Sequence, residues 1–383
     1  MVTWILGRSG TGKTTLLLNK LPALAGEYEQ VYFLVPEQSS MMLEREISQR
    51  KTQGVQVVSF RRLSNVIFRQ FGGIAGSYLS QTKETALIYR ILQEQQGALR
   101  YYAKARPTMG FVNRLAEAFS EFTLSGLRKE TVLPLLEKNG RQDWLEKYRD
   151  LFMLYEAYQG ALGAECRSMA ADLTAATALA REKGFFARSA VVLDGFFGFT
   201  GQQREMLQVI LEQSGCVYCA FLNDPQEESL LFSTAQQELE RLEKLARACG
   251  QECRRLLLAG PSMRLANRDL LFLEQNLFSL HAGAPEEPVA HLQLLEGKNI
   301  REELAMVAVD IGKKVREQGW RYRDVALIAG SLDVYGPVAE TVFAKYGVPL
   351  FIDQGKQSLS KPLFAFVQSA LRLISPERYF RQE

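Results

Sequence analysis

The first sixty positions contain three short, mainly apolar runs, each followed by a segment with helical periodicity. The apolar runs occupy residues 2–7, 31–36 and 55–60. Apolar strand interiors that alternate with helices are typical of a parallel sheet covered on both faces. The pattern therefore predicts an α/β fold that starts at the N-terminus.

The pattern changes between residues 77 and 184, where long amphipathic segments replace the strand-like runs. Apolar runs return at residues 189–196 and 215–224, with a helical segment between them. We therefore predict one α/β domain built from residues 1–76 and 185–281. An all-helical insert over residues 77–184 interrupts it.

Residues 282–288, "AGAPEEP", have the composition of a linker. Beyond them the same alternation starts again, with apolar runs at 291–297, 324–330 and 348–353. Three strands without closure indicate a second α/β domain over residues 289–383 that is only partly present. We expect this second domain to be truncated in the sequence.

The composition is that of a globular protein: 383 residues, 47% of them hydrophobic and 23% charged. No apolar run approaches the roughly 18 residues of a membrane span, and no signal peptide opens the chain, so we expect a cytoplasmic protein without a membrane partner. Five cysteines argue against a disulfide framework. Four of them raise the question of a zinc site: Cys216, Cys219, Cys249 and Cys253. Cys216 and Cys219 would point to opposite faces of one strand, which favours buried thiols.

The charge is unevenly distributed. Between Arg45 and Arg106, eleven Lys or Arg residues stand against three acidic residues, a local excess of +8 in a chain of net charge +3. A basic segment in a nearly neutral chain is compatible with a polyanion-binding surface. A solvated helical surface explains the same count, and the count alone slightly favours it.

"GRSGTGKT", residues 7–14, matches the phosphate-binding pattern G-x-x-x-x-G-K-[ST] between a predicted strand and a predicted helix. Glycines let the backbone curl so that its N–H groups face phosphate oxygens, and the helix adds its positive N-terminal end. Lys13 is expected to reach the β- and γ-phosphates of a nucleotide, and the Thr14 hydroxyl to bind Mg²⁺. The predicted nucleotide-binding residues are Gly7, Arg8, Ser9, Gly10, Thr11, Gly12, Lys13, Thr14 and Thr15.

"VVLDGFFGFTGQQ", residues 191–203, ends an apolar strand in Asp194, which suits a second Mg²⁺ ligand on the same sheet. A carboxylate that caps a turn is the alternative. The next residue is Gly195, which cannot polarise a water molecule, so the usual catalytic base is missing. Asp224 stands at the end of the following strand, where a turn-forming Asp-Pro is favoured over a phosphate sensor.

With these motifs in this order, the chain resembles superfamily 1 helicases of the UvrD kind. More closely, it resembles the N-terminal part of AddB (RexB), a component of the bacterial AddAB helicase–nucleases. The Walker loop, "VYFLVPEQSS", "VQVVSFRRL", the helical insert and "VVLDGFFGFTGQQ" carry the resemblance, together with residues 301–353. It implies a RecA-like P-loop domain with a large helical insert, followed by the start of a second RecA-like domain.

The resemblance also implies function. It suggests ATP and Mg²⁺ as cofactors, DNA as single strand and duplex ends, and an AddA-like motor and nuclease subunit as partner. Phe60, Arg61 and Arg62 lie where relatives touch single-stranded DNA, although core packing explains Phe60 equally well. The nuclease domain and the iron–sulfur cysteines of the family lie C-terminal to this sequence, so its five cysteines are not assigned to a cluster.

The sequence differs from active helicases at positions that couple ATP hydrolysis to movement. Active relatives carry Asp-Glu at the position of Asp194-Gly195, and an arginine where this chain has Gly330 and Ser331. We therefore expect a subunit that binds ATP–Mg and DNA and drives little movement. Three alternatives remain open: an active helicase that recruits another base such as Glu205, a small-molecule P-loop kinase, and a structural subunit that does not hydrolyse or does not bind nucleotide.

Overall fold

A computed structural model describes residues 1–73, 77–162, 166–167, 170–224, 230–279, 283–285, 288–352, 362–363, 366–367 and 369–370. The chain divides into two compact units, Met1–Pro288 and Val289–Glu383, which are described in turn. Among the described residues, no helix is both long enough and apolar enough to cross a membrane.

The first unit is built on a parallel sheet of six described strands, in the order β3-β2-β6-β7-β1-β8. The strands are β1 (Val2–Gly7), β2 (Gln30–Leu34), β3 (Val55–Val58), β6 (Ser189–Phe196), β7 (Cys216–Leu222) and β8 (Cys253–Leu257). This confirms the predicted parallel α/β fold. The sequence pattern did not predict β8, an edge strand in which Arg254 and Arg255 are exposed and break the apolar run.

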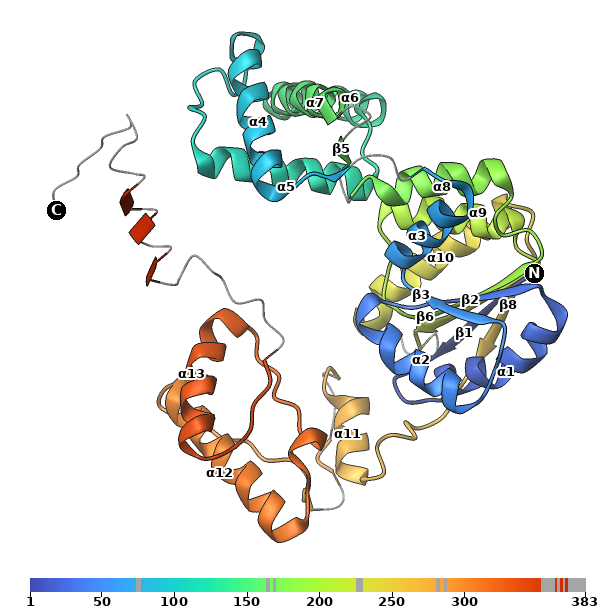
Figure 1. Ribbon diagram of the computed structural model, residues 1–383. Coiled ribbons are helices and arrows are strands. Elements are labelled where there is room, and N and C mark those ends of the chain that lie inside the picture. The colour runs from blue at the N-terminus through green and yellow to red at the C-terminus, as the bar shows by residue number, and fades with distance from the viewer. Residues whose placement is uncertain are drawn as a thin grey trace. The chain divides into compact units, whose positions relative to one another are not determined.

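Helices cover both faces of this sheet (Figure 1). One face carries α1 (Lys13–Glu27) and α2 (Ser40–Gln49). The other carries α3 (Phe60–Phe71), α8 (Asp172–Lys183), α9 (Gly201–Gln213) and α10 (Ser233–Ala248). Ile5 packs against the helices α1 and α2, whereas Trp4 and Leu6 face the opposite helix layer, as the alternation of side chains along β1 requires. Both faces are therefore buried, as in other all-parallel sheets.

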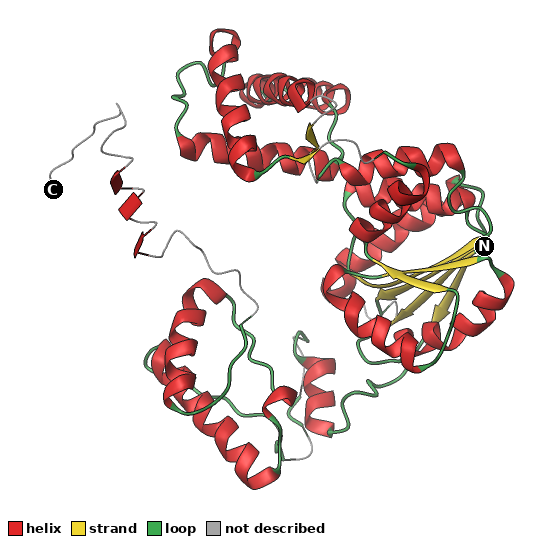
Figure 2. Cartoon of the chain, in the orientation of Figure 1, coloured by secondary structure: helices red, strands yellow, loops and turns green. Residues whose placement is uncertain are grey.

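The helical insert has a core of its own. It consists of α4 (Gln81–Gln95), α5 (Met109–Ser125), α6 (Lys129–Lys138) and α7 (Gln142–Leu162), and β4 (Ser77–Tyr78) pairs with β5 (Cys166–Arg167) in a two-residue ladder at its base. Figure 2 shows this region as helices with only that short ladder of strand. Residues 77–184 were predicted to be insert throughout, but α8 packs on the main sheet through Ala176 and Ala180. Such small apolar residues allow a helix to lie close to a sheet, and their helical periodicity alone does not reveal which core they join.

The insert contacts the sheet domain where α5 ends beside α9. A Cβ atom on Gly201, the first residue of α9, would lie 2.1 Å from the Ser125 carbonyl oxygen, so only glycine permits this approach. Thr200 caps α9 together with Gln203 in a reciprocal capping box. The segment "FTGQQ" is therefore accounted for by helix capping and by the contact with the insert.

The second unit packs α12 (Ile300–Gln318) against α13 (Leu332–Lys345) through Leu304, Ala308 and Phe343. The apolar runs 291–297, 324–330 and 348–353 were predicted to be strands. The structure describes these runs up to residue 352, and within this part they form no strand pairing. A strand requires neighbouring backbone donors and acceptors, which an apolar pattern alone does not supply. Residue 353 lies outside the described residues.

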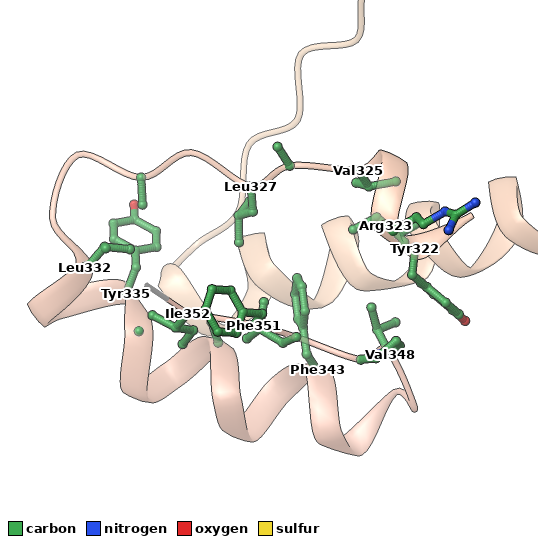
Figure 3. Close-up of a pocket in the computed structure, with 17 residues that line it drawn as sticks. Tyr322, Arg323, Val325, Leu327, Leu332, Tyr335, Phe343, Val348, Phe351 and Ile352 are labelled. Carbon is green, nitrogen blue, oxygen red and sulfur yellow. The ribbon is translucent and has the colours of Figure 1, made fainter. Parts of the chain in front are cut away.

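Two of these runs and α13 enclose an open apolar hollow of about 740 Å³ (Figure 3). Val348 is buried against the helices, whereas Ile328 and Phe351 are 93% and 88% exposed. Along residues 348–352, buried or half-buried side chains alternate with exposed ones, as they do in a strand with one face covered. The described lining residues include no His, Asp, Glu, Lys, Cys, Ser or Thr, so we assign no chemistry to this hollow.

Asp150 provides a test of how the insert is held together. It is 4% exposed, and its carboxylate accepts hydrogen bonds from the backbone N–H groups of Arg100 and Tyr102, each at 3.0 Å to Oδ2. We expect Asp150→Ala to destabilise the protein by about 2–4 kcal/mol, because two partly buried backbone donors lose a charged acceptor. Urea denaturation measures the change. The control Asp143→Ala, exposed on the same helix, is expected to cost less than about 1 kcal/mol, and equal losses for the two variants would contradict the assignment.

Candidate nucleotide-binding site

The glycine-rich loop links β1 to α1 and lines a cleft of about 350 Å³. Gly10 and Gly12 have φ angles of +79° and +89°, a region that L-residues with side chains rarely adopt. A Cβ atom on Gly10 would also lie 2.0 Å from Ser262 Oγ. The loop thus needs its glycines both for its curvature and for close packing. Of the predicted nucleotide-binding residues, those that line the cleft are Ser9, Gly10, Gly12, Lys13, Thr14 and Thr15.

Lys13 lies over the loop and bonds to it. Its Nζ donates to the carbonyl oxygens of Gly7 at 2.7 Å and Arg8 at 2.6 Å. Burial lowers the pKa of Lys13, Asp194 opposes that effect, and Arg264 adds to it. The ammonium group is therefore held at the cleft by the curled backbone.

Asp194 meets Thr14 across the carboxyl edge of the sheet. The Thr14 hydroxyl donates to Asp194 Oδ2 at 2.6 Å, which joins residues 180 positions apart. Burial raises the pKa of Asp194, whereas the hydrogen bonds from Thr14 and from the Gly195 backbone, and the charge of Lys13, lower it. A hydroxyl and a carboxylate oxygen side by side are the hard donors that Mg²⁺ prefers. The Thr14 hydroxyl and the Asp194 carboxylate therefore fit a Mg²⁺ ion.

A bulge in β6 aims Asp194 at Thr14. The pairing of β6 with β7 shifts register between Leu193 and Phe196, and Gly195 within the bulge has a φ of +78°. A Cβ atom on Gly195 would lie 3.3 Å from Pro36 Cδ. A larger residue at this position would be strained in its backbone and tight against Pro36.

Two cleft residues, Met263 and Arg264, were not predicted from the sequence. They lie on the loop after β8, whose backbone follows the glycine loop: Leu258 N–H donates to Leu6 at 2.8 Å and Met263 N–H to Gly10 at 2.9 Å. Arg264 is the second cation at the cleft and influences the pKa of both Lys13 and Asp194. Because β8 did not show in the apolar pattern, nothing in the sequence indicated that this loop lies beside residues 7–14.

The Arg8 side chain, predicted to be part of the nucleotide site, points to other partners. Its guanidinium donates to a Glu274 side-chain oxygen and to the Glu274 carbonyl oxygen, both at 2.9 Å, and lies 3.6 Å from Asp224. It also lies 5.4 Å from the centre of the Phe232 ring. These contacts tie the loop to α11 (Arg268–Asn276), so the Arg8 side chain is structural. Asp224 is an ionic partner of Arg8, and the Pro225 turn lies outside the described residues.

The predicted DNA-contact residues lie beside a second groove, of about 490 Å³. Phe60 is 6% exposed, and its ring packs on Phe196 and Phe199 with centroids 5.5 and 6.2 Å apart. The structure therefore favours the core-packing interpretation of Phe60. Arg61 is exposed and lines the groove, while Arg62 pairs with Glu44.

Other sequence candidates lie away from the cleft. Glu205, considered as a substitute base, pairs with Arg128 of the insert at 3.5 Å and does not line the cleft. The cysteines considered for zinc are free thiols, two of them buried in β7. Among the described residues, no three His, Cys, Asp or Glu side chains are grouped to hold a metal ion.

Comparison with known proteins bears on the whole of the first unit. A family model described as ADDB, N-terminal, matches residues 4–274. The chain belongs to the AddB N-terminal family. The match covers the glycine loop, Asp194 and Arg264 together with the insert, so the site described above lies within the family's shared domain.

Curated relatives extend the similarity into the second unit. Proteins from Desulforudis audaxviator and Acetivibrio thermocellus, each named as a subunit of an ATP-dependent helicase/deoxyribonuclease, are 32% and 29% identical over 97% and 96% of this chain. The protein of the same name from Caldanaerobacter subterraneus is 27% identical over 97% of the chain. Each alignment covers 33% of the relative, so the chain spans about a third of the length of the relatives it matches.

Gly195→Ala tests the bulge. We expect this change to destabilise the protein by about 1–2 kcal/mol, because alanine is strained at positive φ. Chemical denaturation measures it. Gly198→Ala in the same loop is the matched control, since Gly198 does not have a positive φ and a Cβ atom there would meet no atom within 4 Å. A control variant that loses as much stability as Gly195→Ala would refute the strain argument.

Asp194→Asn tests the cost of burying the carboxylate. Because burial raises the pKa of Asp194, the folded state is penalised when this group is ionised, that is, at pH values above its folded pKa. We therefore expect Asp194→Asn to raise the melting temperature at neutral pH. The gain should shrink as the pH falls through the folded pKa and vanish below the ordinary value of 3.8. Thermal unfolding at several pH values measures this, and a variant that is less stable than wild type at neutral pH would contradict it.

Proposed function

We propose that the cleft binds ATP with Mg²⁺. The observation that carries this proposal is the 2.6 Å contact between Thr14 and Asp194 at the mouth of a curled glycine loop. Lys13 and Arg264 supply positive charge for the phosphates, and the loop N–H groups with the start of α1 supply donors. Thr14 and Asp194 would hold the Mg²⁺ ion, which would neutralise part of the phosphate charge.

We propose further that hydrolysis at this site is slow. Asp194 is the single acidic residue among the described residues that line the cleft, and a carboxylate engaged with magnesium cannot also serve as the base. Gly195 offers no side chain, and Glu205 is paired with Arg128. The remaining groups bind and orient a nucleotide but do not activate a water molecule.

In the cell, we propose, the chain acts within an AddAB-type ATP-dependent helicase/exonuclease that processes DNA double-strand breaks. The support is family membership and the names of the relatives, which describe one subunit of a helicase/deoxyribonuclease. An AddA-like subunit would supply the motor, and this chain would bind DNA as single strand or duplex end. The groove beside Arg61 is our candidate for that contact.

Nucleotide binding is tested with a fluorescent ATP analogue, with and without Mg²⁺. We expect Lys13→Ala to weaken binding by about 10- to 100-fold, because a charge-assisted hydrogen bond to phosphate is lost. Lys20→Ala, on the same helix but outside the cleft, is the control and should bind as wild type does. Wild-type protein that fails to bind the analogue would overturn the proposed site.

Phosphate release measured with and without single-stranded DNA tests the second proposal. We expect turnover far below the range of about 1–10³ s⁻¹ that is typical of enzymes, with little change on adding DNA. Helicase-like turnover that DNA stimulates would show that the chain finds a base elsewhere. Binding and hydrolysis are separate readouts, so each proposal stands or falls on its own result.

A further inference from the structure

A loop leads from the 3₁₀ turn η2 (Gln96–Ala98) to α5 (Figure 1), and its sequence has an unusual charge pattern. No acidic residue occurs from Gln95 to Ala116, and the loop carries Arg100, Lys104 and Arg106 within seven positions. The loop belongs to the basic segment between Arg45 and Arg106. Elsewhere in that segment, ion pairs to Glu46, Glu44 and Glu94 engage Arg50, Arg62 and Arg90.

The three loop cations are exposed and form no ion pair with any described residue. Placing like charges close together without acidic partners costs free energy by repulsion. A solvated surface usually reduces that cost by mixing charges of both signs, as the paired arginines do. A loop that keeps only cations instead suits a polyanionic ligand.

The backbone of this loop is held firmly. The buried Asp150 accepts from the N–H groups of Arg100 and Tyr102, and Ala105 N–H donates to the Tyr102 carbonyl oxygen at 2.9 Å. Leu99 is 5% exposed in the core of the insert. The Tyr102 ring packs on Phe111 with centroids 5.2 Å apart, and burial raises its pKa. The cations therefore project from a preorganised backbone, which lowers the entropy lost on binding.

An aromatic side chain accompanies the charges. Tyr101 is 49% exposed beside Arg100, and the Tyr102 ring supports its edge at 4.9 Å and 81°. On α7, the helix that supplies Asp150, Trp144 is 47% exposed with the cations of Arg141 and Lys147 at 5.6 and 5.7 Å from its ring. Exposed rings interleaved with cations are typical of surfaces that bind nucleic-acid strands, because rings stack on bases and cations pair with phosphates.

We propose that the loop 99–108 is a DNA-binding site on the helical insert. Arg100, Lys104 and Arg106 contact the phosphate backbone of a DNA strand, and Tyr101 packs against a base or sugar of that strand. The site is separate from the nucleotide cleft and from the groove beside Arg61. It rests on the DNA-binding part of the proposed function and is independent of whether ATP binds.

The test uses the full chain and fluorescein-labelled DNA, either single-stranded or as a blunt hairpin, with anisotropy measured over a range of salt concentrations. The variant replaces Arg100, Lys104 and Arg106 by glutamine. Three lost phosphate contacts should reduce the slope of log Kd against log salt by about 2 for the single strand or about 3 for the hairpin. The substrate that shows the loss identifies the form of DNA that the loop holds.

The matched control removes the same charge from paired arginines of the insert: Arg90→Gln, Arg114→Gln and Arg149→Gln. We expect its slope to change by less than about 1. Equal slopes for the two triple variants would overturn the proposal, since net charge alone would then explain binding. Displacement of the DNA by poly-glutamate at equal charge concentration would also overturn it, because an acidic protein would then fit the loop as well.

Two further measurements keep the proposals distinct. Tyr101→Ala should weaken single-strand binding without changing the salt slope, because stacking releases no counterions. Binding of the fluorescent ATP analogue and the melting temperature should stay at wild-type values in the loop triple variant. If the loop triple variant loses DNA binding but keeps nucleotide binding, the proposed DNA site is supported. If the wild-type chain binds ATP but no DNA, the proposed DNA site is refuted and the proposed nucleotide site is unaffected.

Discussion

The hydrogen bond between Thr14 and Asp194 is the contact on which the proposed nucleotide site depends. It joins the first turn of α1, the helix that follows β1, to the end of β6. The two strands are separated in the sheet by β7, and the contact forms because all described strands of this sheet end at the same edge. In such sheets, ligands bind beyond the carboxyl ends of the strands, where the connections part to opposite sides. The glycine loop, the β6 bulge and the loop after β8 all converge on this point.

Lys13 and Asp194 lie at this contact, where burial disfavours the charged form of each side chain. Burial lowers the pKa of Lys13 and raises that of Asp194, and each group partly offsets the penalty on the other. Arg264 adds a further positive charge that the cleft does not neutralise. A bound polyanion with a divalent cation would satisfy all three groups, so under the proposed function the site sacrifices stability to bind its ligand.

Local motifs made part of this site predictable. The glycine loop and Asp194 are read from short runs of sequence, and the parallel sheet follows from apolar strands that alternate with helices. Arg264 and Met263 escaped prediction because the strand before them, with Arg254 and Arg255 exposed, lacks the apolar run of its neighbours. The role of Phe60 and the attachment of α8 depend on which core receives a side chain, and periodicity alone does not contain that information.

Gly195 links the geometry of the site to its proposed lack of hydrolysis. The bulge that directs Asp194 of β6 toward Thr14 has Gly195 at positive φ, and Pro36 leaves little room beside Gly195. A glutamate at this position would bring the missing base but would strain the backbone that aims Asp194. The absence of a carboxylate at position 195 is therefore linked to the backbone geometry that directs Asp194 toward Thr14. Under the proposed function, placing a glutamate there would require rebuilding the bulge within β6, together with the packing of Pro36.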